Sequence, residues 1–195
     1  MFSADVVAPH HRTIEQLDAT LDHIRRSPVG TGSVELIVRR PKLQWREVLD
    51  AAELDPVVGL VGDTWNKRPS RTSVDGGPHP LMQLNIMNSR AIAAICGDDP
   101  QWWPLAGDQL YVDMALGADA LPPGTQLALG TAVIEVTAEP HRGCAKFAKR
   151  FGPAATRWVN TAAGVELNLR GINALVLEPG TVVVGDHVRA LATSI

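Results

Sequence analysis

The sequence has little cysteine and few aromatic residues: 195 residues include two Cys, one Tyr, three Phe and five Trp. Two cysteines do not make a disulfide scaffold, so the composition favours a reducing compartment. No uninterrupted apolar run approaches the ~18 residues that a membrane helix needs, and residues 1–12 lack the charged-then-apolar pattern of a leader. We therefore expect a cytoplasmic protein that is neither exported nor inserted into a membrane.

Several catalytic signatures are missing as well. The sequence contains no P-loop, no dinucleotide-binding glycine motif and no recognisable spacing of a Ser-His-Asp triad. The formal net charge is −3 and the pI is near 6.0, which makes nucleic acid a poor partner. The remaining candidates are small-molecule chemistry and protein partners.

The charge is unevenly distributed along the chain. Residues 139–170 carry six cations against two anions, a net of +4, which leaves −7 for the rest of the chain. The cations are Arg142, Lys146, Lys149, Arg150, Arg157 and Arg170. One interpretation is a pocket for an anionic small molecule, because cations concentrate and orient phosphate groups. The other is a solvated helix face, and the sequence leaves both open.

Cys144 lies in this basic stretch, within His141-Arg142-Gly143-Cys144-Ala145-Lys146-Phe147. A thiol reacts, or binds a soft metal, as its thiolate, which a helix N-terminus and neighbouring cations stabilise. A buried packing role is the alternative, because free cysteines are often buried. His141 and Cys144 form a His-x-x-Cys pair, but two ligands do not make a zinc site.

The hydrophobic pattern predicts one helix followed by many short strands. Thr13 and Gln16 form a capping box for a helix over residues 14–26, which Pro28 ends. Val34, Leu36 and Val38 alternate along one face of a first strand. We expect a helical turn or two over residues 44–53 and a long loop over residues 63–80.

The second half of the chain is dominated by strand patterns. Further strands are expected over residues 81–87, 110–114, 126–129, 132–137, 165–169, 172–177, 181–184 and 187–191, with a hairpin at 130–131. Helices are expected over 89–96, which Ser89 would cap, and after Cys144, with a break at Gly152-Pro153 and a second helix over 154–160. Short strands with regular turns indicate a mainly β barrel or sandwich.

Five short motifs occur in an order that resembles the MOSC domain family, the module found at the C-terminus of molybdenum-cofactor sulfurases and in stand-alone bacterial proteins. The motifs are Asp75-Gly76-Gly77-Pro78; Gly107-Asp108-Gln109-Leu110-Tyr111-Val112; Leu121-Pro122-Pro123-Gly124-Thr125; Gly143-Cys144; and Leu169-Arg170-Gly171 with Glu178-Pro179-Gly180 and Val184-Gly185-Asp186. The resemblance covers residues 34–191. It implies a closed β-barrel, like that of pyruvate kinase, over residues 33–195, with an N-terminal helical extension over residues 1–32.

The resemblance also implies a chemistry. Cys144 is similar to the family cysteine that binds molybdenum or carries sulfur, and Arg170 resembles a basic residue near the cofactor. Arg142 and Lys146 are expected to bind the cofactor with Arg170, because the pterin phosphate needs cationic partners, and Asn173 belongs to the same expected set. His79 belongs to the same expected set, although many members carry an acidic residue there. The implied cofactor is molybdopterin.

Three functions stay open at this point. In the first, Cys144 ligates molybdenum and the protein reduces N-hydroxylated substrates with electrons from a partner protein. In the second, Cys144 carries a persulfide from a sulfur-donor protein. In the third, the barrel binds a ligand without catalysis. We expect no pyridoxal-phosphate chemistry in this chain, although the family is often described beside it, and we expect that the protein can form a homodimer.

Overall fold

Seven strands close into a β-barrel in the computed structural model, which describes residues 2–3, 6–8, 11–70, 73 and 75–192. Around the barrel the order is β2, β12, β8, β9, β10, β6 and β7, and β7 pairs back with β2. All of these pairs are antiparallel except β6 with β7. The strands are β2 (Thr31–Arg39), β6 (Leu84–Asn88), β7 (Leu110–Asp113), β8 (Gln126–Leu129), β9 (Ala132–Val136), β10 (Ile172–Glu178) and β12 (His187–Ala190). The expected closed, mainly β barrel is confirmed.

Five short strands extend this barrel. β1 (Phe2–Ser3) and β3 (Trp45–Leu49) continue the sheet beyond β2, while β4 (Ala51–Asp55), β5 (Gly59–Leu60) and β11 (Gly180–Val183) form a second sheet. The prediction of a helical turn or two over residues 44–53 is therefore wrong. Val48 pairs with Val38, and Ala51 pairs with Val183, so the segment supplies edge strands to both sheets.

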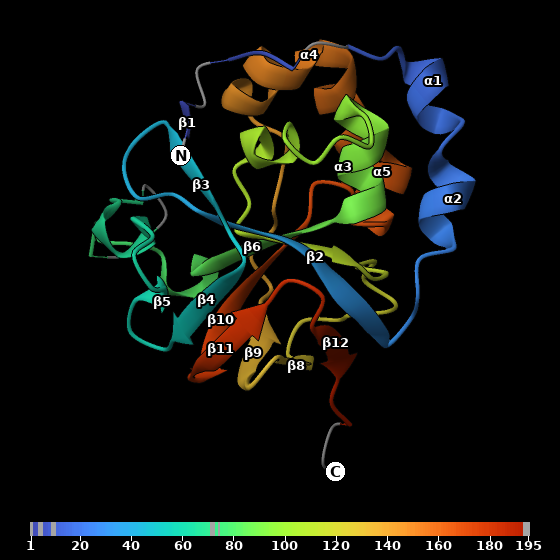
Figure 1. The fold of residues 1–195 in the computed structure, drawn as a ribbon. Coiled ribbons are helices and arrows are strands. Elements are labelled where there is room, and N and C mark those ends of the chain that lie inside the picture. The colour runs from blue at the N-terminus through green and yellow to red at the C-terminus, as the bar shows by residue number, and fades with distance from the viewer. Residues whose placement is uncertain (1, 4–5, 9–10, 71–72, 74, 193–195) are drawn as a thin grey trace.

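The strands separate two hydrophobic cores. Leu84 and Ile86 on β6, and Leu110 and Val112 on β7, fill the barrel, whereas Tyr111 faces the helical layer. This is the two-residue alternation of a strand that is buried on both faces. Figure 1 shows the helices gathered over one end of the barrel.

The first strand departs from the expected alternation. Val34 and Ile37 belong to the barrel core, while Leu36 and Val38 belong to the helical core. The reason is a register shift between Val34 and Leu36 in the pairing with β7, which moves the later side chains to the opposite face. The single face predicted for Val34, Leu36 and Val38 is therefore wrong.

The helical layer begins with two short helices in place of one. α1 (Ile14–Asp18) starts at Thr13 with the predicted capping box, and α2 (Leu21–Arg25) follows after a break at residues 19–20. Leu17 and Ile24 are buried against the other helices. α3 (Ser89–Cys96) is capped by Asn88, one residue before the predicted Ser89, and ends at Gly97. The proposed division at residue 33 stays a prediction.

α4 (Ala145–Val159) follows the cysteine and forms the top of the view in Figure 1. Gly152 has a φ of 85°, so the helix is broken there as expected and a second half starts at Pro153. Phe147, Phe151 and Trp158 are buried on its inner side. The amphipathic pattern thus fixes which face of α4 meets the protein.

α5 (Ala162–Glu166) occupies the place where a strand over residues 165–169 was expected, and that expectation is wrong. The Thr161 side chain accepts a hydrogen bond from the Gly164 amide and caps this short helix. A side chain on Gly164 would meet the Trp158 carbonyl at 2.3 Å, so the glycine permits the close approach to α4.

Short 3₁₀ helices lie in the loops between these elements. They are η1 (Trp65–Lys67), η2 (Pro80–Met82) and η3 (Trp103–Ala106). The first two lie within or beside the long loop expected over residues 63–80, of which residues 71–72 and 74 fall outside the described part. None of the helices in the described ranges has the length and apolar character to cross a membrane.

Candidate functional site

Cys144 is exposed at the start of α4. Its backbone is extended, with φ of −120° and ψ of 175°, and it occupies the N-cap position of the helix. Within the described part of the chain its side chain makes no capping hydrogen bond. The predicted place at a helix start is confirmed, and the alternative of a buried packing cysteine does not describe this residue.

A buried ion pair lies on the inner side of this helix start. Arg170, at the end of the loop before β10, contacts both carboxylate oxygens of Asp108 at 2.9 and 2.8 Å. The Arg170 guanidinium carbon lies 4.9 Å from the centre of the Phe147 ring, which belongs to the first turn of α4. His141 approaches the same carboxylate, with Nδ1 3.5 Å from Oδ1. The segment just before Cys144 therefore packs against the Arg170–Asp108 ion pair.

A polar network reaches this segment from the other side. Arg40, at the end of β2, donates to both oxygens of buried Asp63 at 2.8 and 2.9 Å, and to Asn85 Oδ1 at 2.9 Å. Asn85 Nδ2 donates to Asn173 Oδ1 at 2.6 Å, and Asn173 Nδ2 donates to the Glu139 carbonyl at 3.0 Å. Strands β2, β6 and β10 thus hold the backbone that leads to the cysteine.

Among the described residues, four arginines but only two carboxylates are buried. Burial, followed by the charges of neighbouring arginines, lowers the pKa of Arg46 to about 10, and burial and Arg40 lower the pKa of Arg68 to about 10. Burial disfavours ionisation of Asp63, but the charge and hydrogen bonds of Arg40 outweigh it and lower the pKa of that carboxyl. Such an excess of buried cations favours an anionic ligand.

Four buried polar atoms have no hydrogen-bond partner among the described residues: Asn66 Oδ1, His79 Nδ1, His141 Nδ1 and Arg170 Nε. Two of them belong to the expected site, namely those of His79 and Arg170. Buried polar atoms are normally paired, so an unpaired group needs a reason such as an absent ligand or water. His79 also approaches Glu139, with Nε2 3.7 Å from Oε1.

The expected site residues separate into two groups. Arg170, Asn173 and His79 converge on residues 137–141 through the contacts described above. Arg142 and Lys146 are exposed beside Cys144. The cofactor roles of all five, and the metal role of Cys144, stay predictions.

A cavity of about 220 Å³ opens beside the cysteine loop. Its polar lining comes from Glu139, His141, Arg142 and Asn168, and apolar side chains such as Leu121 form much of the rest. Burial, Arg170 and Arg40 lower the pKa of His141 well below its ordinary value, so its imidazole is neutral at pH 7. A neutral imidazole offers one donor and one acceptor.

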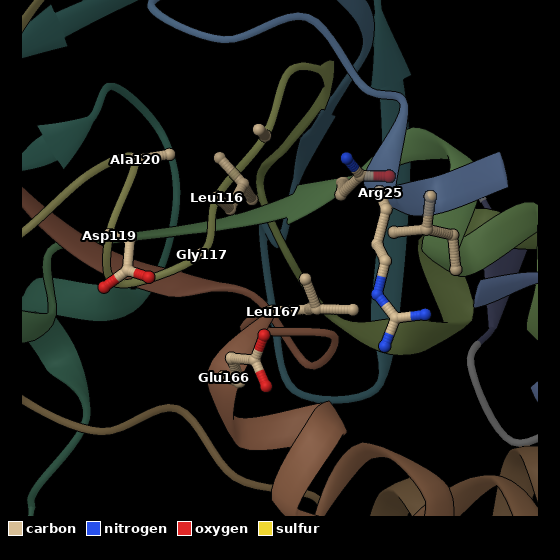
Figure 2. A pocket seen from close by; sticks show the side chains of 10 residues that line it. Arg25, Leu116, Gly117, Asp119, Ala120, Glu166 and Leu167 are labelled. Carbon is tan, nitrogen blue, oxygen red and sulfur yellow. The ribbon is translucent and has the colours of Figure 1, made fainter. Parts of the chain in front are cut away.

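A second cavity, of about 140 Å³, lies elsewhere, between α2 and the α5 end. Figure 2 shows Asp119 and Glu166 on one side of Leu167 and Arg25 on the other. None of the expected site residues lines it. This cavity is consequently separate from the candidate site.

Sequence reasoning missed the residues that organise the site: Arg40, Asp63, Asn85 and the pairing of Asp108. They come from four distant segments, so no local spacing joins them. The available signal was the placement of Asp63 and Asp108 directly after glycine, next to apolar strands. In the described ranges, no group of three or more His, Cys, Asp or Glu side chains is placed to hold a metal ion.

Comparisons with known proteins agree with this fold. A model of the MOSC domain family matches residues 81–189, more than half of the chain. YuaD from Bacillus subtilis superposes with a TM-score of 0.58 at 17% identity, covering 82% of this chain and 95% of that one. YiiM from Escherichia coli gives 0.54 at 17% identity, covering 83% and 71%. A search of curated proteins finds no match. The chain therefore belongs to the MOSC domain family, which is associated with binding of the molybdenum cofactor.

Proposed function

We propose that this protein binds the molybdenum cofactor with Cys144 as a sulfur ligand and reduces N-hydroxylated substrates. The observation that carries the proposal is the position of one exposed thiol at the start of α4, directly after a segment held by buried ionic and polar groups. A soft thiolate is a suitable ligand for a soft metal centre.

The described residues fit such a group. A pterin presents ring nitrogens that donate and accept hydrogen bonds, and the buried unpaired atoms of His79 and Arg170 supply both kinds of partner. Its phosphate is an anion, for which the interior excess of guanidinium groups, including Arg46 and Arg68, provides a favourable field. The guanidinium groups of Arg46 on β3 and Arg68 after η1 would thus favour the phosphate, and residues near the cysteine would favour the pterin.

When bound, the cofactor supplies two-electron redox chemistry. Reduction of an N-hydroxyl group to an amine consumes two electrons and two protons and releases water, so a separate electron donor is required. The chain contributes the Cys144 sulfur, a neutral His141 that lines the adjacent cavity, and Arg142 at the same cavity. We assign the cavity of about 220 Å³ to the substrate.

Metal and pterin analysis of protein from a cofactor-competent host tests the proposal. Wild-type protein is expected to contain molybdenum and pterin, and Cys144→Ser is expected to lose most of its molybdenum. Cys96→Ser is the matched control, because Cys96 is buried in α3 and only 2% exposed. Absence of molybdenum from the wild type, or equal retention in both variants, would refute the role of Cys144.

A sulfur-carrier function is the second candidate. The favouring observation is that Cys144 is exposed on the surface, where the thiol of another protein can reach it. It predicts wild-type protein whose mass exceeds the sequence mass by one sulfur, removable by reductant and absent from Cys144→Ser. Mass spectrometry of freshly purified protein distinguishes this function from metal ligation.

A further inference from the structure

Four exposed cations surround the start and outer face of α4. We call Arg142, Lys146, Lys149 and Arg157 the α4 basic face. None of the four forms an ion pair in the part of the chain that the structure describes. The helix Ala145–Val159 contains no acidic residue. The face is therefore a localised positive surface.

Packing fixes the direction in which this face points. The buried side of α4 holds Phe147, Phe151 and Trp158, so Lys149 and Arg157 project outward from the opposite side. One nearby acid contacts α4 through a residue of its buried side. Asp18 of α1, which packs on α4, accepts a hydrogen bond from Trp158 Nε1.

The basic face borders the reactive thiol. Cys144 lies between Arg142 and Lys146 in the chain and occupies the N-cap position of the helix, whose N-terminus adds a further partial positive charge. A partner molecule whose negatively charged surface binds this face therefore comes close to the exposed Cys144 sulfur. Long-range attraction of this kind raises association rates by about 10- to 1,000-fold at low salt.

We propose that the α4 basic face is the docking surface for a small electron-transfer protein with an acidic surface. The inference rests on the proposed function, because reduction at a centre held by Cys144 needs an electron donor that this chain does not contain. The occupant is argued from charge complementarity and from the position of the face beside the thiol.

The charge distribution argues against a nucleic acid or an anionic membrane as the occupant. Outside residues 139–170 the chain carries a net charge of −7, so an extended polyanion that reaches beyond α4 is repelled. A compact acidic protein can contact the helix alone. The face also offers no large exposed apolar side chain for insertion into a bilayer, among those of the described residues.

Two peptide probes test the steering to Cys144 in protein produced without the cofactor, in which no metal occupies the thiol. Each carries a central pyridyl-disulfide cysteine, flanked by four aspartates in one and four lysines in the other. The Cys144 thiolate attacks the cysteine sulfur, the probe's disulfide breaks and pyridine-2-thione is released, which absorbance records. Buried Cys96 does not compete. At low ionic strength we expect the acidic peptide to react about tenfold faster than the basic one, and the ratio to fall towards one at high salt.

A charge-reversed variant and a matched control complete this test. Lys149→Glu with Arg157→Glu spares the expected cofactor residues Arg142 and Lys146, and should bring the rate ratio to one or below. Arg26→Glu with Arg189→Glu changes the same charge at exposed positions, one directly after α2 and one on β12, and should preserve the wild-type ratio. Equal rates in the wild type, or an equal loss in both double variants, would overturn the proposal.

Binding of a whole protein is then measured with flavodoxin as an acidic electron-transfer probe. We expect salt-dependent binding to the wild type and to the control, and at least about tenfold weaker binding to the charge-reversed variant. Tighter binding of a short DNA duplex or of phosphatidylserine vesicles than of flavodoxin would overturn the proposal.

The molybdenum content of the same variants separates the docking hypothesis from the cofactor hypothesis. Normal molybdenum content with equal reaction rates of the two peptides would refute only the docking surface. Faster reaction of the acidic peptide in protein that never contains molybdenum would refute only the cofactor function.

Discussion

Arg170 and Asp108 form a buried ion pair in which one guanidinium nitrogen, Nη1, contacts both carboxylate oxygens. The side chains are 7% and 0% exposed. Nη2 donates to the Ala106 carbonyl, so the arginine also fixes the backbone before β7. The pair joins the start of β10 to this backbone and supports His141, three residues before the cysteine.

Asp108→Asn should destabilise the protein strongly. The substitution keeps the shape of the side chain but leaves the Arg170 charge buried without a counter-ion, which costs about 3–5 kcal/mol. Urea denaturation should therefore show this loss in the free energy of unfolding. Asp119→Asn removes the same charge at an exposed position and should change stability by no more than about 0.5 kcal/mol. Equal effects of the two substitutions would contradict the pairing.

His141 should make stability depend on pH in the mildly acid range. Its folded pKa lies well below the ordinary value because of burial and then of Arg170 and Arg40, so the unfolded chain binds the proton more readily. The stabilising contribution is present above the unfolded pKa of about 6.5 and is lost as the pH falls below it, by at most about 1.4 kcal/mol per pH unit.

The measurement compares the free energy of unfolding at pH 7.5 and 5.5. Wild-type protein should lose more stability between these values than His141→Gln. His187→Gln is the control, because His187 is exposed on β12, and it should follow the wild type. A wild-type slope in His141→Gln would show that the imidazole takes up its proton as readily in the folded protein as in the unfolded chain.

The fold was predictable where local patterns determine it. The capping box at Thr13 and Gln16 and the hairpin between β8 and β9 were correct, because both depend on residues close in sequence. The register shift in β2 was not visible, because it depends on pairing with β7. The helix at residues 162–166 replaced a predicted strand for a related reason, since Gly164 packs against the end of α4.

The candidate site was predictable only in part. The basic stretch identified Cys144 and six cations, but the sequence did not separate buried Arg150 and Arg170 from the exposed cations. Asp108 was visible in a motif, yet its partner lies 62 residues away. Contacts over such separations follow from the closed barrel and have no local signature.

The two cysteines should react at very different rates. Cys144 is exposed, whereas burial raises the pKa of the Cys96 thiol to about 12. Native protein produced without the cofactor should therefore release one equivalent of thionitrobenzoate quickly with Ellman's reagent, and the second only on unfolding. Cys144→Ser should abolish the fast phase and retain the wild-type melting temperature. A fast phase that persists in this variant would mean that Cys96 is accessible.

Gly171 should be far less replaceable than a glycine in open space. It follows Arg170 with a φ of 104°, and an added Cβ would lie 2.3 Å from the Ile86 carbonyl oxygen. Gly171→Ala must therefore strain the backbone and push β10 away from β6, the two strands that carry Asn173 and Asn85. Gly185 has a φ of 91° with no atom near its Cβ position, so Gly185→Ala isolates the backbone strain, which is about 1–3 kcal/mol. Chemical denaturation should show a larger loss of stability for Gly171→Ala than for Gly185→Ala. Equal losses would mean that β10 and β6 separate without cost, and the polar network would then not be held by their close approach.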